Sequence, residues 1–224
     1  MEKILLVDLD NTLLDFDKTE NEALSKVLLH FNIEDNIENR NKYYDINVAY
    51  WKKYELHQIE REKLLGLRFV DFFSLFDLKV DGFLVNEMYF SFLSQNAYKI
   101  KNCEEFCKKC HELDYRIIIA SNGVGSVQKP RLEKSGLLRY FDRVYLSEEI
   151  GFNKPDVEFF ETILKDYPFK DKMVMIGDSL SSDIQGGKNF NVPTIWYNPK
   201  GNISNLPDYQ VKDLLEIFKV LEEI

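Results

Sequence analysis

Four aliphatic residues, Ile4 to Val7, lie near the start of the chain and run directly into two aspartates, Asp8 and Asp10. An unbroken apolar run that ends in polar residues predicts a strand buried on both faces, as in parallel sheets. Because side chains alternate along a strand, we expect Asp8 and Asp10 on the same side, within reach of one reacting centre. Neighbouring carboxylates share a proton or need a cation, so folding alone does not explain them. The run therefore points to chemistry.

Helix-like and strand-like patterns alternate from residue 99 onward. Predicted strands cover residues 116–120, 143–146, 173–176 and 194–197, and predicted helices cover 103–113, 127–135, 157–165, 181–189 and 214–221. Such alternation is typical of βαβ units, which build a parallel sheet. The sequence therefore predicts an α/β fold whose core is a Rossmann-like parallel sheet with helices on both faces.

The segment that follows the first strand has helical periodicity instead. Amphipathic patterns cover residues 20–31, 39–61, 64–76 and 85–93. About 110 residues separate Asp10 from Ser121, whereas about 33 separate Ser121 from Lys154. We therefore expect a small all-helical domain inserted after the first strand. In this division residues 1–15 and 95–224 form the sheet core, and residues 16–94 form the inserted domain.

Charge and hydropathy restrict the partners of the chain. The 224 residues carry a net charge of −9, which repels polyanions at long range, so a nucleic-acid polymer is not an expected partner. A small anionic substrate then needs a cation or a local basic group. No apolar stretch approaches the roughly 20 residues of a membrane span. Because Met1-Glu2-Lys3 leads straight into the first strand, leaving no room for a signal peptide, we expect a cytoplasmic protein without a membrane partner.

The three cysteines, Cys103, Cys107 and Cys110, are spaced along one face of a predicted helix. One interpretation is a metal or redox site completed by His111. The other is a buried helix face that uses Cys as a small apolar residue. The sequence has no second Cys or His cluster that would complete a tetrahedral site, which favours the buried face.

Polar residues follow several of the predicted strands. In open parallel sheets, ligands bind beyond the carboxyl ends of the strands. One strand ends in Ser121-Asn122-Gly123, whose hydroxyl and backbone N–H groups suit phosphate oxygens. Another ends in Gly177-Asp178, and Asp183 follows on the next helical turn. Carboxylates at this place suit Mg²⁺. Between these two strand ends lies Lys154, just before a helix-starting proline.

Taken together, these motifs resemble those of the haloacid-dehalogenase superfamily of phosphotransferases, and the resemblance covers nearly the whole chain. It rests on Asp8-Leu9-Asp10-Asn11-Thr12, Ser121-Asn122-Gly123, Lys154-Pro155, and Gly177-Asp178 with Asp183. The fold that the resemblance implies is a Rossmann-like core with a movable helical cap, which closes the site from water.

The resemblance also implies a role for each motif residue. Asp8 corresponds to the nucleophile that takes the phosphoryl group, and Asp10 corresponds to the general acid/base. Ser121 and the backbone of Asn122 are expected to bind the phosphate group. Lys154 is expected to bridge this phosphate group and the nucleophile.

Mg²⁺ is the cofactor that the resemblance implies. Its expected ligands are Asp8, the carbonyl group of Asp10, and Asp178, with Asp183 acting either directly or through a water molecule. The physical need is plain, because a phosphate monoester dianion repels a carboxylate nucleophile. Mg²⁺ and Lys154 are expected to neutralise charge before attack.

Three further details resemble the pyrimidine 5′-nucleotidase branch of the superfamily. They are Asp15-Phe16-Asp17, Gln128-Lys129-Pro130-Arg131-Leu132 with Gly136-Leu137, and Ser181-Ser182-Asp183-Ile184 with Gly186-Gly187. The expected function is therefore hydrolysis of a small phosphorylated metabolite, a nucleoside 5′-monophosphate, through an aspartyl-phosphate. A phosphoglycolate or sugar-phosphate phosphatase, or a phosphomutase, is the alternative. A non-enzymatic nucleotide-binding module is a different class, and the chain is expected as a monomer or homodimer.

Aromatic residues are frequent in the inserted segment, and stacking on a nucleobase is one use for them. The candidates are Tyr43, Tyr44, Trp51, Phe69, Phe72 and Phe73. Packing inside the inserted domain explains most of them equally well.

Overall fold

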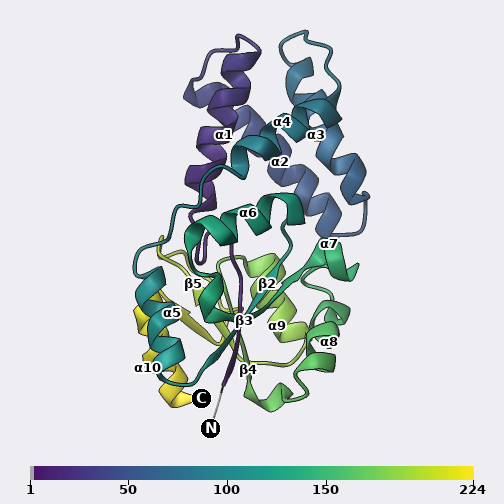
Figure 1. Ribbon diagram of the computed structural model, residues 1–224. Helices are drawn as coiled ribbons and strands as arrows, with labels where there is room; N and C mark the ends of the chain where they lie inside the picture. Colours follow the sequence, from purple (N-terminus) through teal and green to yellow (C-terminus); the bar gives the residue numbers. More distant parts are fainter. Residues whose placement is uncertain (1–2) are drawn as a thin grey trace. The chain divides into compact units, whose positions relative to one another are not determined.

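A computed structural model describes residues 3–224 (Figure 1). The chain divides into two compact units, one formed by Met1–Phe16 with Ala97–Ile224 and the other by Asp17–Asn96. We call them the sheet unit and the helical unit. The helical unit is one continuous segment that interrupts the sheet unit after its first strand.

The sheet unit is built on a six-stranded sheet in which all paired strands are parallel. The strands are β1 (Ile4–Val7), β2 (Arg116–Ser121), β3 (Phe141–Leu146), β4 (Met173–Gly177), β5 (Thr194–Tyr197) and β6 (Tyr209–Val211). Their order across the sheet is β3-β2-β1-β4-β5-β6. The predicted Rossmann-like parallel sheet is thereby confirmed, with the strand that precedes Asp8 at its centre.

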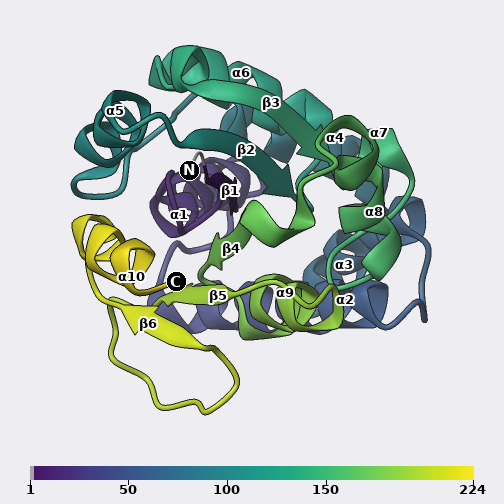
Figure 2. The ribbon, with the colours of Figure 1, turned by 90° about the horizontal axis from the view of Figure 1, so that it is seen from below.

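Helices cover both faces of this sheet. The α-helices of the sheet unit are α5 (Cys103–Glu112), α6 (Gly125–Ser135), α7 (Ser147–Ile150), α8 (Val157–Asp166), α9 (Gln185–Asn189) and α10 (Ile217–Glu223). Figure 2 shows α5 and α10 on one face and α8 and α9 on the other. Short 3₁₀ turns are η1 (Leu138–Tyr140), η2 (Lys170–Lys172) and η4 (Leu214–Glu216), and η3 (Leu180–Ile184) is a π-helical turn.

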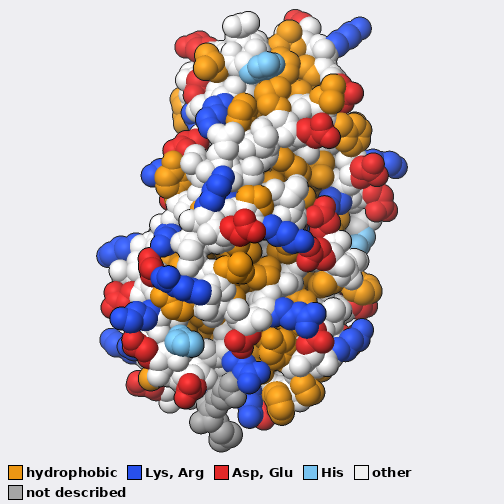
Figure 3. Space-filling model, viewed as in Figure 1, with side chains coloured by type: hydrophobic (Ala, Val, Ile, Leu, Met, Phe, Trp, Pro, Cys, Tyr) orange, Lys and Arg blue, Asp and Glu red, His pale blue; other side chains and the backbone are white. Residues whose placement is uncertain are grey.

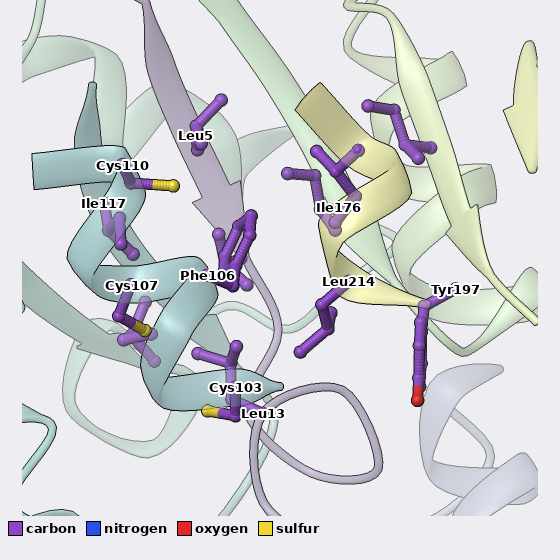
Figure 4. Packing of buried hydrophobic residues seen from close by; sticks show 14 of the residues in the cluster. Leu5, Leu13, Cys103, Phe106, Cys107, Cys110, Ile117, Ile176, Tyr197 and Leu214 are labelled. Atoms are coloured by element: carbon purple, nitrogen blue, oxygen red, sulfur yellow. The ribbon is translucent and has the colours of Figure 1, made fainter. Parts of the chain in front are cut away.

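Alternating side chains of β1 enter two different cores. Leu5 and Val7 pack in the core that contains residues of α5 and α10, whereas Ile4 and Leu6 pack in the core that contains residues of α8 and Phe190, which follows α9. Figure 4 shows Leu5 close to Phe106 of α5. Because all four side chains are almost fully removed from water, β1 is anchored on both faces. The residue that follows it is therefore held in a fixed place.

The cysteines of α5 are free thiols inside the first of these cores. Figure 4 shows Cys103, Cys107 and Cys110 among apolar side chains such as Leu13 and Ile117. Burial raises the pKa of the Cys110 thiol above its ordinary value, which keeps this sulfur protonated and apolar. The interpretation of a buried helix face is confirmed.

Several elements of the sheet unit differ from the sequence prediction, among them the helix expected over 214–221, which is the turn η4 followed by α10. The edge strand β6 is too short to give an alternating pattern, and α7 is a single turn. The helix expected over 181–189 begins as the π-helical turn η3, in which the hydroxyl of Ser179 accepts a hydrogen bond from the N–H of Ser182. This turn brings Asp183 to the end of β4.

The helical unit contains helices along nearly its whole length. They are α1 (Phe16–His30), α2 (Ile37–Glu55), α3 (Arg61–Ser74) and α4 (Gly82–Leu93). The prediction of a helix over 39–61 was wrong at its end, because α2 stops at Glu55. His57 adopts a left-handed conformation with φ of 54°, and the N–H of Gln58 donates to the carbonyl of Lys53. No glycine marks this turn in the sequence.

Four of the six candidate aromatic residues form the interior of the helical unit. Tyr43, Phe69, Phe72 and Phe73 are at most 1% exposed. The rings of Tyr43 and Phe69 stack with their centroids 5.5 Å apart, and Phe72 meets Tyr43 edge-on. Their rings are covered by the unit's own side chains, so packing explains these four. Tyr44 is exposed and Trp51 is half-buried, which leaves these two with accessible ring surface.

The surface carries charges of both signs. On the face seen in Figure 3, basic side chains (blue) and acidic side chains (red) alternate with one another, and the basic ones form no large continuous area. Within residues 3–224, no helix is both long enough and apolar enough to cross a membrane.

Candidate active site

The register of the sheet brings the polar strand ends together. Val7 pairs with Ile119 of β2 and with Ile176 of β4, and the N–H of Asp8 donates to the carbonyl of Ile176 at 2.9 Å. Asp8 therefore lies level with the last residues of both neighbouring strands. The polar residues that follow those strands are placed on either side of it, where ligands of parallel sheets bind.

Lys154 is the cation of this site and is 1% exposed. Its Nζ donates to Oδ1 of Asp8 at 2.8 Å, to Oδ1 of Asp183 at 2.6 Å, and to the carbonyl of Ala120. Burial opposes its charge, but Asp183 and Asp8 outweigh this effect and raise the pKa of Lys154. The lysine is therefore charged and bridges two carboxylates.

The carboxylates of Asp8, Asp178 and Asp183 form one group, in which one oxygen of each lies within 4.8 Å of the others. Asp183 lies within η3, and its side chain approaches Gly177 at the end of β4. Its Oδ2 accepts a hydrogen bond from the N–H of Ser179, which precedes η3, at 3.0 Å. Gly177 permits this approach, because a Cβ atom there would lie 2.2 Å from the same oxygen. Only glycine at position 177 therefore leaves room for the group to form.

Burial makes this concentration of negative charge unfavourable. It raises the pKa of Asp8 to about 7, with Lys154 opposing the rise and Asp183 and Asp10 adding to it. Burial, followed by the charges of Asp8 and Asp183, also raises the pKa of Asp178 well above its ordinary value. One lysine therefore does not neutralise the three carboxylates.

A divalent cation fits this group of oxygens. Mg²⁺ prefers hard oxygen ligands and is commonly held by one or two carboxylates together with water molecules. Asp8 and Asp178 offer such oxygens, and the excess negative charge supplies the attraction. Both oxygens of Asp183 already accept hydrogen bonds, one from Lys154 and one from Ser179. This arrangement favours contact between Asp183 and a cation through water.

Ser121 is the last residue of β2, and Asn122, which follows it, is hydrogen-bonded to the backbone of Lys154. The side chain of Asn122 accepts from the N–H of Lys154 and donates to its carbonyl, both at 2.8 Å. The N–H of Gly123 donates to Oγ of Ser121 at 3.1 Å. Asn122 thus ties the lysine loop to the end of β2 through its side chain, in addition to the expected role of its backbone in phosphate binding.

Asp10 lies apart from the group of three carboxylates. Its Oδ2 accepts from Nε2 of Gln128 and its Oδ1 from Nη1 of Arg131, each at 2.5 Å. β1 ends at Val7, so both aspartates lie in the loop beyond it and strand alternation does not set their directions. That Asp8 and Asp10 act on one reacting centre stays a prediction. That the carbonyl group of Asp10 binds a metal stays a prediction as well.

Thr12, Trp196, Gln128 and Arg131 are among the residues that contact the predicted site without having been assigned to it from the sequence. The hydroxyl of Thr12 lies 3.3 Å from Asp8 and 3.5 Å from Asp178, and the indole of Trp196 donates to the carbonyl of Asp178 at 2.7 Å. The other two are Gln128 and Arg131, which hold Asp10. Thr12, Gln128 and Arg131 belong to sequence motifs that resemble those of the superfamily, so these motifs could have indicated them. No motif contains Trp196.

The sequence matches a family model, haloacid dehalogenase-like hydrolase, over residues 5–197. Two curated relatives share a descriptive name. Pyrimidine 5′-nucleotidase PynA of Streptococcus pneumoniae is 38% identical over 99% of this chain and 98% of its own. Pyrimidine 5′-nucleotidase YjjG of Escherichia coli is 28% identical over 97% and 96% of the two chains. The superfamily resemblance inferred from the motifs is confirmed.

A solved structure agrees with the fold over the full length. The HAD hydrolase YfnB of Bacillus subtilis, in a crystal form bound to magnesium, is 30% identical and covers 99% of each chain with a TM-score of 0.92. The magnesium belongs to that protein. For the present chain, the similarity shows the same fold over both units.

Metal binding is testable without an activity assay. We expect millimolar Mg²⁺ to raise the thermal unfolding midpoint, because the cation relieves repulsion among Asp8, Asp178 and Asp183. At a concentration one hundred times the Kd, the stabilisation is about 2.7 kcal/mol. Asp178→Asn should remove most of the shift, whereas Glu161→Gln, an exposed change on α8, should keep it. An equal shift in the wild type and in Asp178→Asn, measured by calorimetry, would contradict the assignment.

Proposed function

The chain belongs to the haloacid dehalogenase-like hydrolase family, and on that premise we propose that it is a Mg²⁺-dependent phosphatase of nucleoside 5′-monophosphates. The observation that carries the proposal is the buried carboxylate of Asp8, held 2.8 Å from Lys154 at the end of the central strand. A carboxylate in this position is a nucleophile directed to the ligand side of the sheet. The neighbouring lysine and acidic residues prepare the site for a dianion and a divalent cation.

In the first step, a carboxylate oxygen of Asp8 attacks the phosphorus atom of the ester. The bond between phosphorus and the ester oxygen breaks, and the departing oxygen takes a proton from Asp10, which carries that proton when the ester binds and regains one in the second step. Lys154 reduces the repulsion between the carboxylate and the phosphate dianion. When bound, Mg²⁺ supplies further neutralisation of charge on the transferring group. The Ser121 hydroxyl binds a phosphate oxygen and orients the group for in-line transfer.

In the second step, water cleaves the aspartyl-phosphate. Asp10, now ionised, takes a proton from the water molecule, whose oxygen attacks phosphorus. The bond between phosphorus and the oxygen of Asp8 breaks, and inorganic phosphate leaves with Asp8 restored. One difficult hydrolysis is thus divided into two easier transfers. A dehalogenase needs no acid two residues after its nucleophile, so Asp10 favours the phosphatase.

The choice of nucleotide substrate rests on similarity. PynA and YjjG, both named pyrimidine 5′-nucleotidases, match this chain over nearly its full length. Of the candidate aromatic residues, Tyr44 and Trp51 keep accessible ring surface. We propose that one of these two rings contacts the base. A small phosphorylated metabolite as partner, a cytoplasmic location, and a monomeric or dimeric state stay predictions.

Two carboxamide substitutions test the roles of the aspartates. Asp8→Asn should abolish turnover, because an amide is a poor nucleophile. Asp10→Asn should lower kcat by about 10²–10⁴-fold, the usual contribution of general acid–base catalysis. Asp171→Asn, at the opposite end of β4 in η2, is the matched control and should behave as the wild type. Steady-state phosphate release measures all three, and substantial activity in Asp8→Asn would contradict the covalent mechanism.

Substrate preference is tested by comparing kcat/KM values. Pyrimidine nucleoside monophosphates should be hydrolysed better than phosphoglycolate or hexose phosphates. Tyr44→Ala or Trp51→Ala, whichever removes the base-contacting ring, should lower kcat/KM for nucleotides. The loss of transition-state stabilisation should be about 1–3 kcal/mol, the free energy of base–aromatic stacking. The kcat/KM value for a small aryl phosphate should stay unchanged in these variants. Phe169→Ala, a change of an exposed aromatic residue before β4, should leave kcat/KM unchanged for both substrates. A tenfold lead for phosphoglycolate or a sugar phosphate would exclude the nucleotidase.

A further inference from the structure

Two side chains of α6 determine how the carboxylate of Asp10 is oriented. Arg131 donates to Oδ1 and Gln128 donates to Oδ2, each at 2.5 Å. Each oxygen therefore has a donor of its own, and rotation of the carboxylate would break both hydrogen bonds. The side chain of Arg131 is fully buried, whereas that of Asp10 is 26% exposed. The partly accessible carboxylate is thus fixed from its buried side.

Arg131 also determines the orientation of the Gln128 amide. Its Nη1 donates to Oε1 of Gln128 at 2.7 Å. A guanidinium group has only donors, so the amide oxygen must face Arg131. The amide nitrogen then points to the other side, where both Asp10 and Ser121 lie. Without Arg131, the opposite orientation of the amide would present its oxygen to the Asp10 carboxylate.

The same amide nitrogen acts on Ser121. Nε2 of Gln128 lies 3.3 Å from Oγ of Ser121, which also accepts from the N–H of Gly123 at 3.1 Å. A hydroxyl group has two acceptor positions and one hydrogen to donate. Because both acceptor positions are used, the hydroxyl hydrogen is left to be donated. Ser121 is therefore prepared as a donor to a phosphate oxygen.

Fold stability does not explain Arg131. Its Nε and Nη2 atoms are buried and have no hydrogen-bond partner among residues 3–224, and its charge is balanced by Asp10. The guanidinium group lies 5.2 Å from the centroid of the Phe16 ring. An apolar side chain of similar size would fill this space without the desolvation of a charge. A role in orienting neighbouring groups accounts for an arginine here.

We propose that Gln128 and Arg131 are positioning residues that align two reacting groups together, the acid/base Asp10 and the phosphate donor Ser121. The inference rests on the proposed function, because it concerns the same site. It adds that the proton-transfer group and the phosphate-binding group are joined through one amide. Loss of this amide should therefore impair proton transfer more than the attack of Asp8 itself.

The test compares two esters in rapid-mixing experiments on the full chain. A nucleoside monophosphate needs a proton on its leaving oxygen, whereas 4-nitrophenyl phosphate has a leaving group that departs without one. In Gln128→Glu, which keeps the shape of the side chain but removes both amide hydrogens, phosphorylation by the nucleotide should fall at least 10²-fold. Phosphorylation by the aryl ester should fall less than tenfold. Because cleavage of the aspartyl-phosphate also needs Asp10, nitrophenol should appear in a burst.

Gln128→Met, which lacks all polar atoms of the amide, is a second variant in case the carboxylate of Gln128→Glu disturbs folding. It should give the same ratio between the phosphorylation rates with the two esters and the same burst of nitrophenol. Lys129→Gln, on the same helix but exposed and paired on the surface with Glu149, should leave both esters at wild-type rates.

An equal fall for both esters without a burst would indicate a merely structural role and overturn the inference, as would unchanged rates in both variants. If the wild type hydrolyses neither ester, the proposed function is wrong and the inference falls with it. If the wild type hydrolyses both esters and the variants lower the two phosphorylation rates by the same factor, only the inference is overturned.

Discussion

The bridge that Lys154 makes between Asp8 and Asp183 is the interaction on which the site depends. Three buried carboxylates repel one another, and removal from water raises the pKa of Asp8 and Asp178. Lys154 offsets part of this repulsion, and its backbone is tied to the end of β2 by Asn122. The remaining negative charge is the attraction available to a divalent cation. In the proposed function, this balance prepares the site for a metal ion and a phosphate group.

The order of the strands explains how distant residues reach one another. The central strand β1 is buried on both faces and pairs with β2 on one side and β4 on the other. The ends of these strands are then held level with Asp8, where Ser121 is the last residue of β2 and Asp178 follows β4. The π-helical turn η3 returns Asp183 to the same place. Packing in the two cores thus sets the positions of the polar groups beyond the strand ends.

The sequence predicted the elements with strong local patterns and missed those set by contacts between segments. The run Ile4–Val7 predicted β1, and Asp8, Asp178 and Lys154, the site residues expected from the sequence, lie in one group or in contact with it. The end of α2 was misplaced because a histidine, not a glycine, adopts the left-handed turn. The clamp on Asp10 was missed because Gln128 reaches it across 118 positions of sequence. The indole of Trp196, likewise, acts through the backbone of Asp178, which no pattern of side chains reveals.

The most direct test of the account asks where the phosphoryl group goes in the first turnover. In Asp10→Asn, the first step with 4-nitrophenyl phosphate needs no acid, while cleavage of the aspartyl-phosphate is slow. Rapid acid quench followed by mass spectrometry of the peptide that contains Asp8 should therefore find the phosphoryl group on that carboxylate, in step with the release of nitrophenol. Release of nitrophenol while Asp8 remains unmodified, or a phosphoryl group on another residue, would contradict the account.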